Sequence, residues 1–199
     1  MTNNYVITFT RQFGSLGRQI AQKVSELLDI EYYDRDIVEH AAKKMKLPSS
    51  TVTEAEESVK TVLFNMQYPL GLGTSKIQDK VFETQKELIN EYVENENCIV
   101  VGRCADYILR DHPKSLHIFL YASYEERVVN CVNALYLSAS EAKKMIKSVD
   151  AARASYHKHY AGYLPGDKEH YHIQINTALL GIDGTAELIA DIAKKKFDL

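Results

Sequence analysis

The amino-acid sequence predicts an α/β fold in which a five-stranded parallel sheet is covered by helices on both faces. Short apolar segments rich in β-branched residues alternate along the chain with longer segments whose apolar residues recur at helical spacing. The 199 residues suffice for one domain with its own hydrophobic core. Ligands of such folds bind at the carboxyl ends of the strands, so functional residues are expected directly after each strand.

Each expected element rests on its own local pattern. Strands are predicted at 5–10, 30–33, 98–102, 116–121 and 171–176. Helices are predicted from Gly17 and from Asp36, and then over 124–135, 139–161 and 184–196. The segment 48–96 has a charged helical pattern, interrupted by a turn-rich break at 68–73.

Composition and charge exclude several classes of protein. The net charge of −3 shows no basic excess, which argues against nucleic acid as a partner. No apolar segment is long enough to span a membrane, and the first residues lack a signal-peptide pattern, so a cytoplasmic protein is expected. The three cysteines are expected to be buried, reduced thiols. No metal cluster is expected, because the histidine pairs 157/159 and 170/172 lack suitable spacing or a third ligand.

The turn after the first strand has the character of a phosphate-binding loop. Placed on the pattern G-x-x-x-x-G-K-[ST], Gly17 takes the second glycine and Arg18 the lysine, while Gln12 replaces the first glycine and Gln19 the magnesium-binding hydroxyl. Glycines still allow backbone N–H groups to face a phosphate at a helix N-terminus. We therefore expect a cradle for donor phosphates made by Gly14, Ser15, Leu16, Gly17, Arg18 and Gln19. The alternative is a plain strand–helix turn.

Several separate segments resemble cytidylate kinases and their cytidylate-kinase-like relatives. Residues 7–18 resemble the relatives' opening signature S/T-R-Q-aromatic-G-S-x-G-R, in which the arginine and the loss of the hydroxyl are normal. Residues 98–103 and 116–127 resemble the cytidylate-kinase segment V-x-G-R-D followed by K-I-F-L-x-A-S-x-E-E-R. Residues 150–153 resemble the lid signature D-x-x-R, and residues 171–189 resemble the last strand and final helix.

The resemblance implies a three-layer P-loop NTPase fold and a kinase reaction. The core would comprise residues 1–47 and 97–199 of a single domain, with a helical acceptor-binding insertion at about 48–96 and a helical lid at about 140–168. The implied reaction moves the γ-phosphoryl group of ATP, with Mg²⁺, to a nucleoside monophosphate or a similar small acceptor. CMP or dCMP is the favoured acceptor.

The resemblance also implies roles for individual residues. Those assigned to acceptor binding are Asp34, Arg35 and Arg103. Those assigned to the donor and the transferring phosphoryl group are Arg18, Arg127, Asp150 and Arg153. Asp150 and Arg153 are three residues apart on one helix face, so the carboxylate is expected to orient the guanidinium.

Simpler interpretations of these residues remain open at the level of sequence. Arg103 could be a surface arginine paired with Asp106, and Asp34 could belong only to an acidic helix start. Asp150 and Arg153 could form a solvated ion pair.

The sequence also leaves a second function class open. Gln19 and Cys104, which stands where cytidylate kinases have the aspartate of G-R-D, favour a catalytically degenerate nucleotide-binding regulatory or partner-binding protein. The partly apolar helices of residues 48–96 offer a surface for a homodimer.

Overall fold

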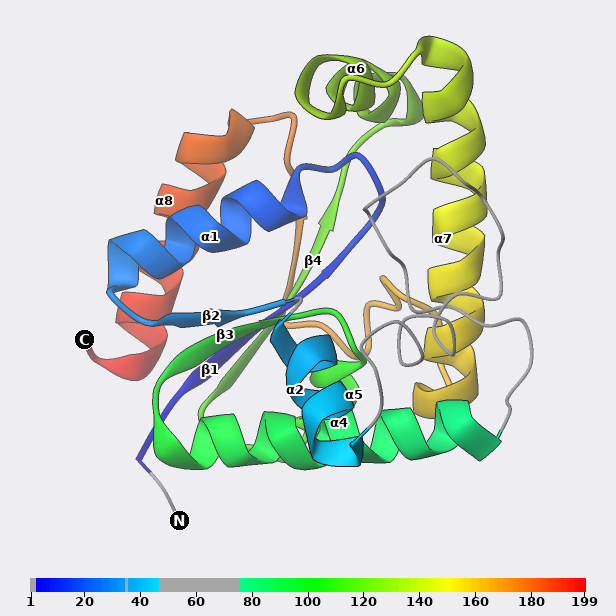
Figure 1. Ribbon diagram of the computed structural model, residues 1–199. Coiled ribbons are helices and arrows are strands. Elements are labelled where there is room, and N and C mark those ends of the chain that lie inside the picture. Colours follow the sequence, from blue (N-terminus) through cyan, green and yellow to red (C-terminus); the bar gives the residue numbers. More distant parts are fainter. Residues whose placement is uncertain (1–2, 35, 47–75) are drawn as a thin grey trace.

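Five parallel strands form one sheet in the computed structural model, which describes residues 3–34, 36–46 and 76–199 (Figure 1). The strands are β1 (Val6–Arg11), β2 (Glu31–Tyr33), β3 (Cys98–Val101), β4 (Ser115–Tyr121) and β5 (Ile173–Asn176). Their order across the sheet is β2-β3-β1-β4-β5, and every neighbouring pair is parallel. The predicted α/β fold is thereby confirmed, and the carboxyl ends of β1 and β3 lie side by side at its centre.

The helices follow the predicted pattern closely. They are α1 (Gly17–Leu28), α2 (Asp36–Met45), α4 (Lys76–Asn95), α5 (Ala105–Ile108), α6 (Tyr124–Leu135), α7 (Ala139–Ala161) and α8 (Gly181–Phe197). The bounds of α6 and α7 agree with the sequence pattern, whereas no bounds were predicted for α5. The helix α8 begins earlier than predicted, and β5 begins at Ile173, so His170 and His172 precede that strand.

Two helical layers enclose the sheet. On one face, α1 and α8 lie side by side (Figure 1) and pack against alternating strand residues such as Ile7, Phe9 and Ile118. On the other face, α2, α4 and α5 pack against Val6 and Val100. Burial of both faces explains why β3 is wholly apolar.

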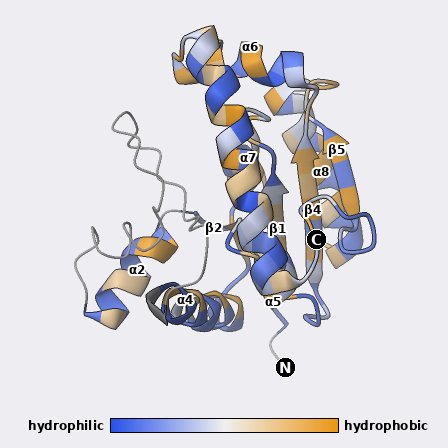
Figure 2. Cartoon of the chain, turned by 90° about the vertical axis from the view of Figure 1, so that its right-hand side faces the viewer, coloured by the Kyte–Doolittle hydropathy of each residue, from blue (hydrophilic) through white to orange (hydrophobic). Residues whose placement is uncertain are grey.

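The helices α6 and α7 form a separate pair beside the loop that follows β1. Both begin with a capping box, in which Ser123 and Glu126, or Ser138 and Glu141, exchange hydrogen bonds with each other's backbone N–H. A cluster that includes Phe13, Cys131, Ile146 and Val149 joins this pair to the loop. Hydrophobic and hydrophilic residues alternate along helix α7 (Figure 2), as expected for a helix with one buried face.

The cysteine prediction is confirmed, because Cys98, Cys104 and Cys131 are buried and free. Among the described residues, no helix combines the length and the apolar character needed to cross a membrane. Residues 48–75 of the expected acceptor-binding insertion lie outside the described residues, so its boundaries stay a prediction, as do those of the lid.

Candidate active site

The loop between β1 and α1 borders a cavity at the carboxyl end of the sheet. The backbone turns through Gly14 and Leu16, whose φ angles are 80° and 58°. Leu16 precedes α1 without a side-chain cap hydrogen bond, so no side chain of the cap serves the first N–H groups of the helix. The cavity has a volume of about 70 Å³ and is lined by Arg11, Gln12, Phe13, Gly14, Leu16, Gly17, Arg18, Gln19, Leu135 and Arg153. A helix N-terminus and three arginines make it suited to an anion.

A buried carboxylate holds arginines together beside this cavity. Asp34 is 4% exposed and follows β2. Its Oδ2 accepts a hydrogen bond from Arg18 Nε at 2.5 Å, and its Oδ1 lies 3.8 Å from Arg11 Nη2. Burial alone would raise the pKa of Asp34, but the charges of Arg11, Arg18 and Arg103 outweigh it and hold that pKa below its usual range. Three cations around one carboxylate leave an excess of positive charge.

The turn between β3 and α5 brings Arg103 to the same place. Gly102, Arg103 and Cys104 all have positive φ angles, of 78°, 57° and 54°. The φ of Gly102 favours glycine, and a Cβ at this position would come too close to Nη1 of Arg11, so the guanidinium would have to move away. Arg103 is buried, which excludes a surface ion pair. The carboxylate of Asp106, the partner considered for Arg103, is hydrogen-bonded to Thr10, His157 and Tyr163.

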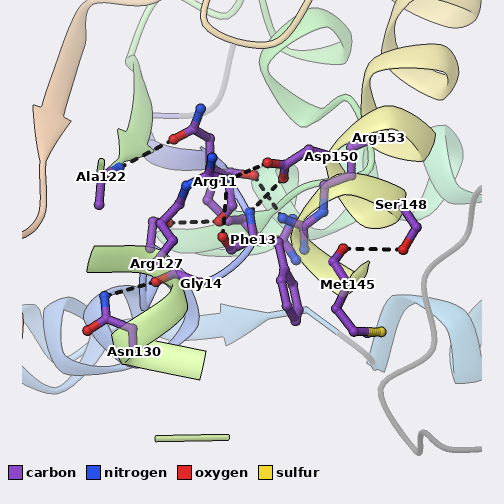
Figure 3. A network of polar contacts seen from close by, with 12 residues as sticks. Arg11, Phe13, Gly14, Ala122, Arg127, Asn130, Met145, Ser148, Asp150 and Arg153 are labelled. Carbon is purple, nitrogen blue, oxygen red and sulfur yellow. Dashed lines mark hydrogen bonds and ion pairs between the residues drawn. The ribbon is translucent and has the colours of Figure 1, made fainter. Parts of the chain in front are cut away.

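Helix α7 is hydrogen-bonded to the loop at two points (Figure 3). The Oδ1 of Asp150 accepts a hydrogen bond from the backbone N–H of Phe13 at 2.8 Å. One turn later, Nη1 of Arg153 donates to the backbone oxygen of Arg11 at 2.9 Å. The geometry differs from the alternative of a solvated ion pair, since one side chain reaches the last residue of β1 and the other the loop that follows it. Asp150 also forms an ion pair with Arg127, and orientation of the Arg153 guanidinium by the Asp150 carboxylate stays a prediction.

Two residues assigned to phosphate binding, Arg127 and Ser15, do not line the cavity. Arg127 is 8% exposed, donates to the backbone oxygen of Phe13 at 3.4 Å and does not line the cavity. Ser15 is fully buried, and its hydroxyl donates to the backbone oxygen of Gln12 at 2.9 Å. Both positions support the shape of the loop, and a direct phosphate contact by either side chain stays a prediction. Arg35 lies outside the described residues.

A model of the cytidylate kinase-like family matches residues 6–179. The chain belongs to this family. The match includes the loop, the β3–α5 turn and the α7 residues that contact the loop. A comparison with curated proteins gives no match.

Solved structures show the same fold at low sequence identity. An uncharacterized protein from Eubacterium ventriosum superposes with a TM-score of 0.72 at 22% identity, covering 96% of this chain and 99% of that chain. Shikimate kinase from Acinetobacter baumannii, in complex with shikimate, has a TM-score of 0.54 at 13% identity and coverages of 96% and 94%. A gluconokinase from Sinorhizobium meliloti has a TM-score of 0.52 at 10% identity and coverages of 100% and 98%. The fold is that of the P-loop kinases.

The site of this kinase-like protein contains a residue that sequence reasoning did not assign. Arg11 is the last residue of β1 and lines the cavity, and its positive charge helps to lower the pKa of Asp34. Its position at a strand end, directly before the loop, was the available signal. Its partners could not be read from the sequence, because Asp34 and Gly102 are distant along the chain.

Proposed function

We propose that the protein transfers the γ-phosphoryl group of ATP, with Mg²⁺, to a nucleoside monophosphate, with CMP or dCMP favoured. Membership of the cytidylate kinase-like family supports a phosphotransferase. The observation that carries the proposal is the cavity at the N-terminus of α1, which is lined by Arg11, Arg18 and Arg153. Positive charge around a phosphate-sized opening is what transfer of a phosphoryl group needs.

In the proposed reaction, the arginines divide between the two substrates. Gly14, Gly17 and the first turn of α1 would hold the donor phosphates, with Arg18 and Arg153 at the group in transfer. Arg103 and Asp34 would face the acceptor, and Arg11 would stand between them, since its side chain contacts Asp34 and lies against Gly102. The protein needs no general base if the acceptor is already a phosphate, because positioning and charge neutralisation do most of the work.

The residues at the cavity are suited to a Mg²⁺ ion that is bound through substrate phosphates and water rather than by a protein carboxylate. Gln19 lines the cavity and offers an amide oxygen. Ser15 is fully buried and does not line the cavity, and Asp34 is surrounded by arginines. Mg²⁺ keeps several waters and is commonly bound through substrate phosphates. When bound, it would neutralise charge on the donor phosphates; the arginines hold those phosphates in place.

A release assay for ADP tests the proposal across CMP, dCMP, UMP, AMP and GMP. We expect acceptor-dependent turnover that falls about 10³-fold in Arg18→Ala, the loss typical of an arginine at a transferring phosphate. Arg103→Ala should raise the KM of the acceptor. Arg110→Ala is the matched control, because that side chain is 53% exposed and pairs with its neighbour Asp111.

The position of Gln19 favours one second candidate, a nucleotide-binding protein without turnover. It predicts that ATP raises the melting temperature of the wild type but not of Arg18→Ala, with no ADP released for any acceptor. If ATP neither binds nor turns over, both candidates are wrong.

A further inference from the structure

A buried polar cluster adjoins the site from behind, and the proposed reaction does not use it. Its centre is Asp106 of α5, which is 1% exposed. Asp106 Oδ2 lies 3.0 Å from Nε2 of His157 on α7 and accepts a hydrogen bond from the Tyr163 hydroxyl at 2.8 Å. Its Oδ1 accepts from the hydroxyl of Thr10 in β1 at 3.2 Å. One carboxylate therefore joins a strand, two helices and the segment that follows α7.

The surroundings of His157 require a doubly protonated ring. Its Nε2 faces the Asp106 carboxylate, and its Nδ1 lies 3.0 Å from the backbone oxygen of Tyr163. Both partners are acceptors, so only the imidazolium form donates from both nitrogens. The Tyr171 hydroxyl, 3.5 Å from Nε2, is the third group that faces the ring. Burial alone would lower the pKa of His157, but the hydrogen bond and charge of Asp106 outweigh it, so that pKa is raised.

Three members of the cluster, His157, Thr10 and Asp106, lie close in sequence to arginines of the site. His157 follows Arg153 by one helical turn, so the two side chains share a face of α7. Thr10 directly precedes Arg11, and Asp106 follows Arg103 across the turn after β3. The cluster thus binds together three segments that carry arginines of the site: Arg11 and Arg153 line the cavity, and Arg103 acts on the buried Asp34 beside it.

We propose that the buried His157–Asp106 ion pair is a positioning device that holds helix α7 on the core with Arg153 at the phosphate loop. After deprotonation of His157, one of its two ring nitrogens carries no hydrogen and can no longer donate a hydrogen bond to the acceptor that it faces. The contact between α7 and α5 then weakens, and Arg153 loses its fixed distance from Arg11. Because Arg153 acts on the group in transfer, the loss appears in kcat more than in the KM of either substrate. This kinetic consequence rests on the proposed function.

The pair can be tested with His157→Gln, which keeps one donor toward Asp106 and does not titrate. In the wild type, kcat should fall as pH rises through the pKa of His157, and this alkaline limb should be absent from His157→Gln. The variant should lose about tenfold or more in kcat at neutral pH, since small misplacements of catalytic groups are costly. His159→Gln is the matched control, two residues away on α7 with a side chain 51% exposed, and should keep both the rate and the limb.

Two measurements on the full chain decide the inference without any turnover. Histidine ring nitrogens followed by NMR should give a pKa for His157 above the usual value of about 6.5. Amide hydrogen exchange in the C-terminal half of α7 should be at least tenfold faster in His157→Gln than in His159→Gln, with β4 unchanged. A pKa at or below the usual value, or equal exchange in the two variants, overturns the proposal. Absence of turnover in the wild type would contradict the proposed function only, and an alkaline limb that persists in His157→Gln would contradict the positioning role.

Discussion

At Gly14, the loop between β1 and α1 has a φ of +80° and packs directly against helix α6. A Cβ here would lie 2.8 Å from the backbone oxygen of Arg127 and 2.9 Å from the Cys131 sulfur. Gly14→Ala therefore combines a left-handed backbone with a collision, and we expect it to lower the free energy of unfolding by about 1–3 kcal/mol beyond the backbone strain alone. Urea unfolding followed by circular dichroism measures this loss.

Gly162→Ala is the control that isolates the collision. Gly162 ends α7 with a φ of +85°, and a Cβ there would meet nothing within 4 Å. Its substitution should cost only the backbone strain, about 1 kcal/mol. Equal losses in the two variants would show that α6 yields to the added methyl group and would contradict the prediction.

Residue types at the site were predictable where the local pattern carries the information. Gly14, Gly17 and Arg18 follow a strand and open a helix, and the structure places them at one cavity. The roles of Asp106 and His157 were not predictable, because their pairing depends on where the end of α7 packs. Sequence spacing identifies neighbours along one element, whereas contacts between elements come from tertiary packing.

Between elements, Asp150 links α7 to both the loop and α6. Arg127 is buried, so removing its partner leaves a poorly compensated charge, and the N–H of Phe13 loses its acceptor. We expect Asp150→Ala to lower the free energy of unfolding by about 1–3 kcal/mol. Asp150→Asn should cost less, because its amide oxygen can still accept from Phe13. Asp183→Ala, a surface carboxylate with a side chain 78% exposed, should stay within about 0.5 kcal/mol of the wild type in the same urea series.

The extent of each element could be predicted only where both of its ends carry a signal. Helices α6 and α7 begin at Ser-x-x-Glu capping boxes, and their long apolar periodicity fixes their type. Helix α5 has only four residues, too few to show a period, and its start at Cys104 depends on a left-handed backbone. The early start of α8 at Gly181 follows a non-helical Leu180 that no sequence pattern marks.

For the whole molecule, alternation of strands and helices predicted a parallel sheet, but strand order depends on which helices cover which face. That order places β1 between β3 and β4, so Thr8 of β1 meets His117 of β4 inside the sheet, with 2.8 Å between the Thr8 hydroxyl and His117 Nδ1. His117 is 4% exposed, and burial lowers its pKa to about 4. The same fold that raises the pKa of His157 thus lowers the pKa of His117.

These opposite shifts predict how stability depends on pH. His117 binds a proton more readily in the unfolded chain, so its contribution is complete above the usual pKa of about 6.5 and is lost as pH falls toward 4. A pKa lower by about 2.5 corresponds to on the order of 3 kcal/mol. His157 has the opposite sign: its raised pKa stabilises the fold at lower pH, and this contribution is lost as pH rises through that pKa.

In urea unfolding at several pH values, stability should fall from pH 7 to pH 4.5 less steeply in His117→Asn than in the wild type, whatever the absolute stability of the variant. His159→Asn should keep the wild-type slope, and an unchanged slope in His117→Asn would mean that acid unfolding begins at another group.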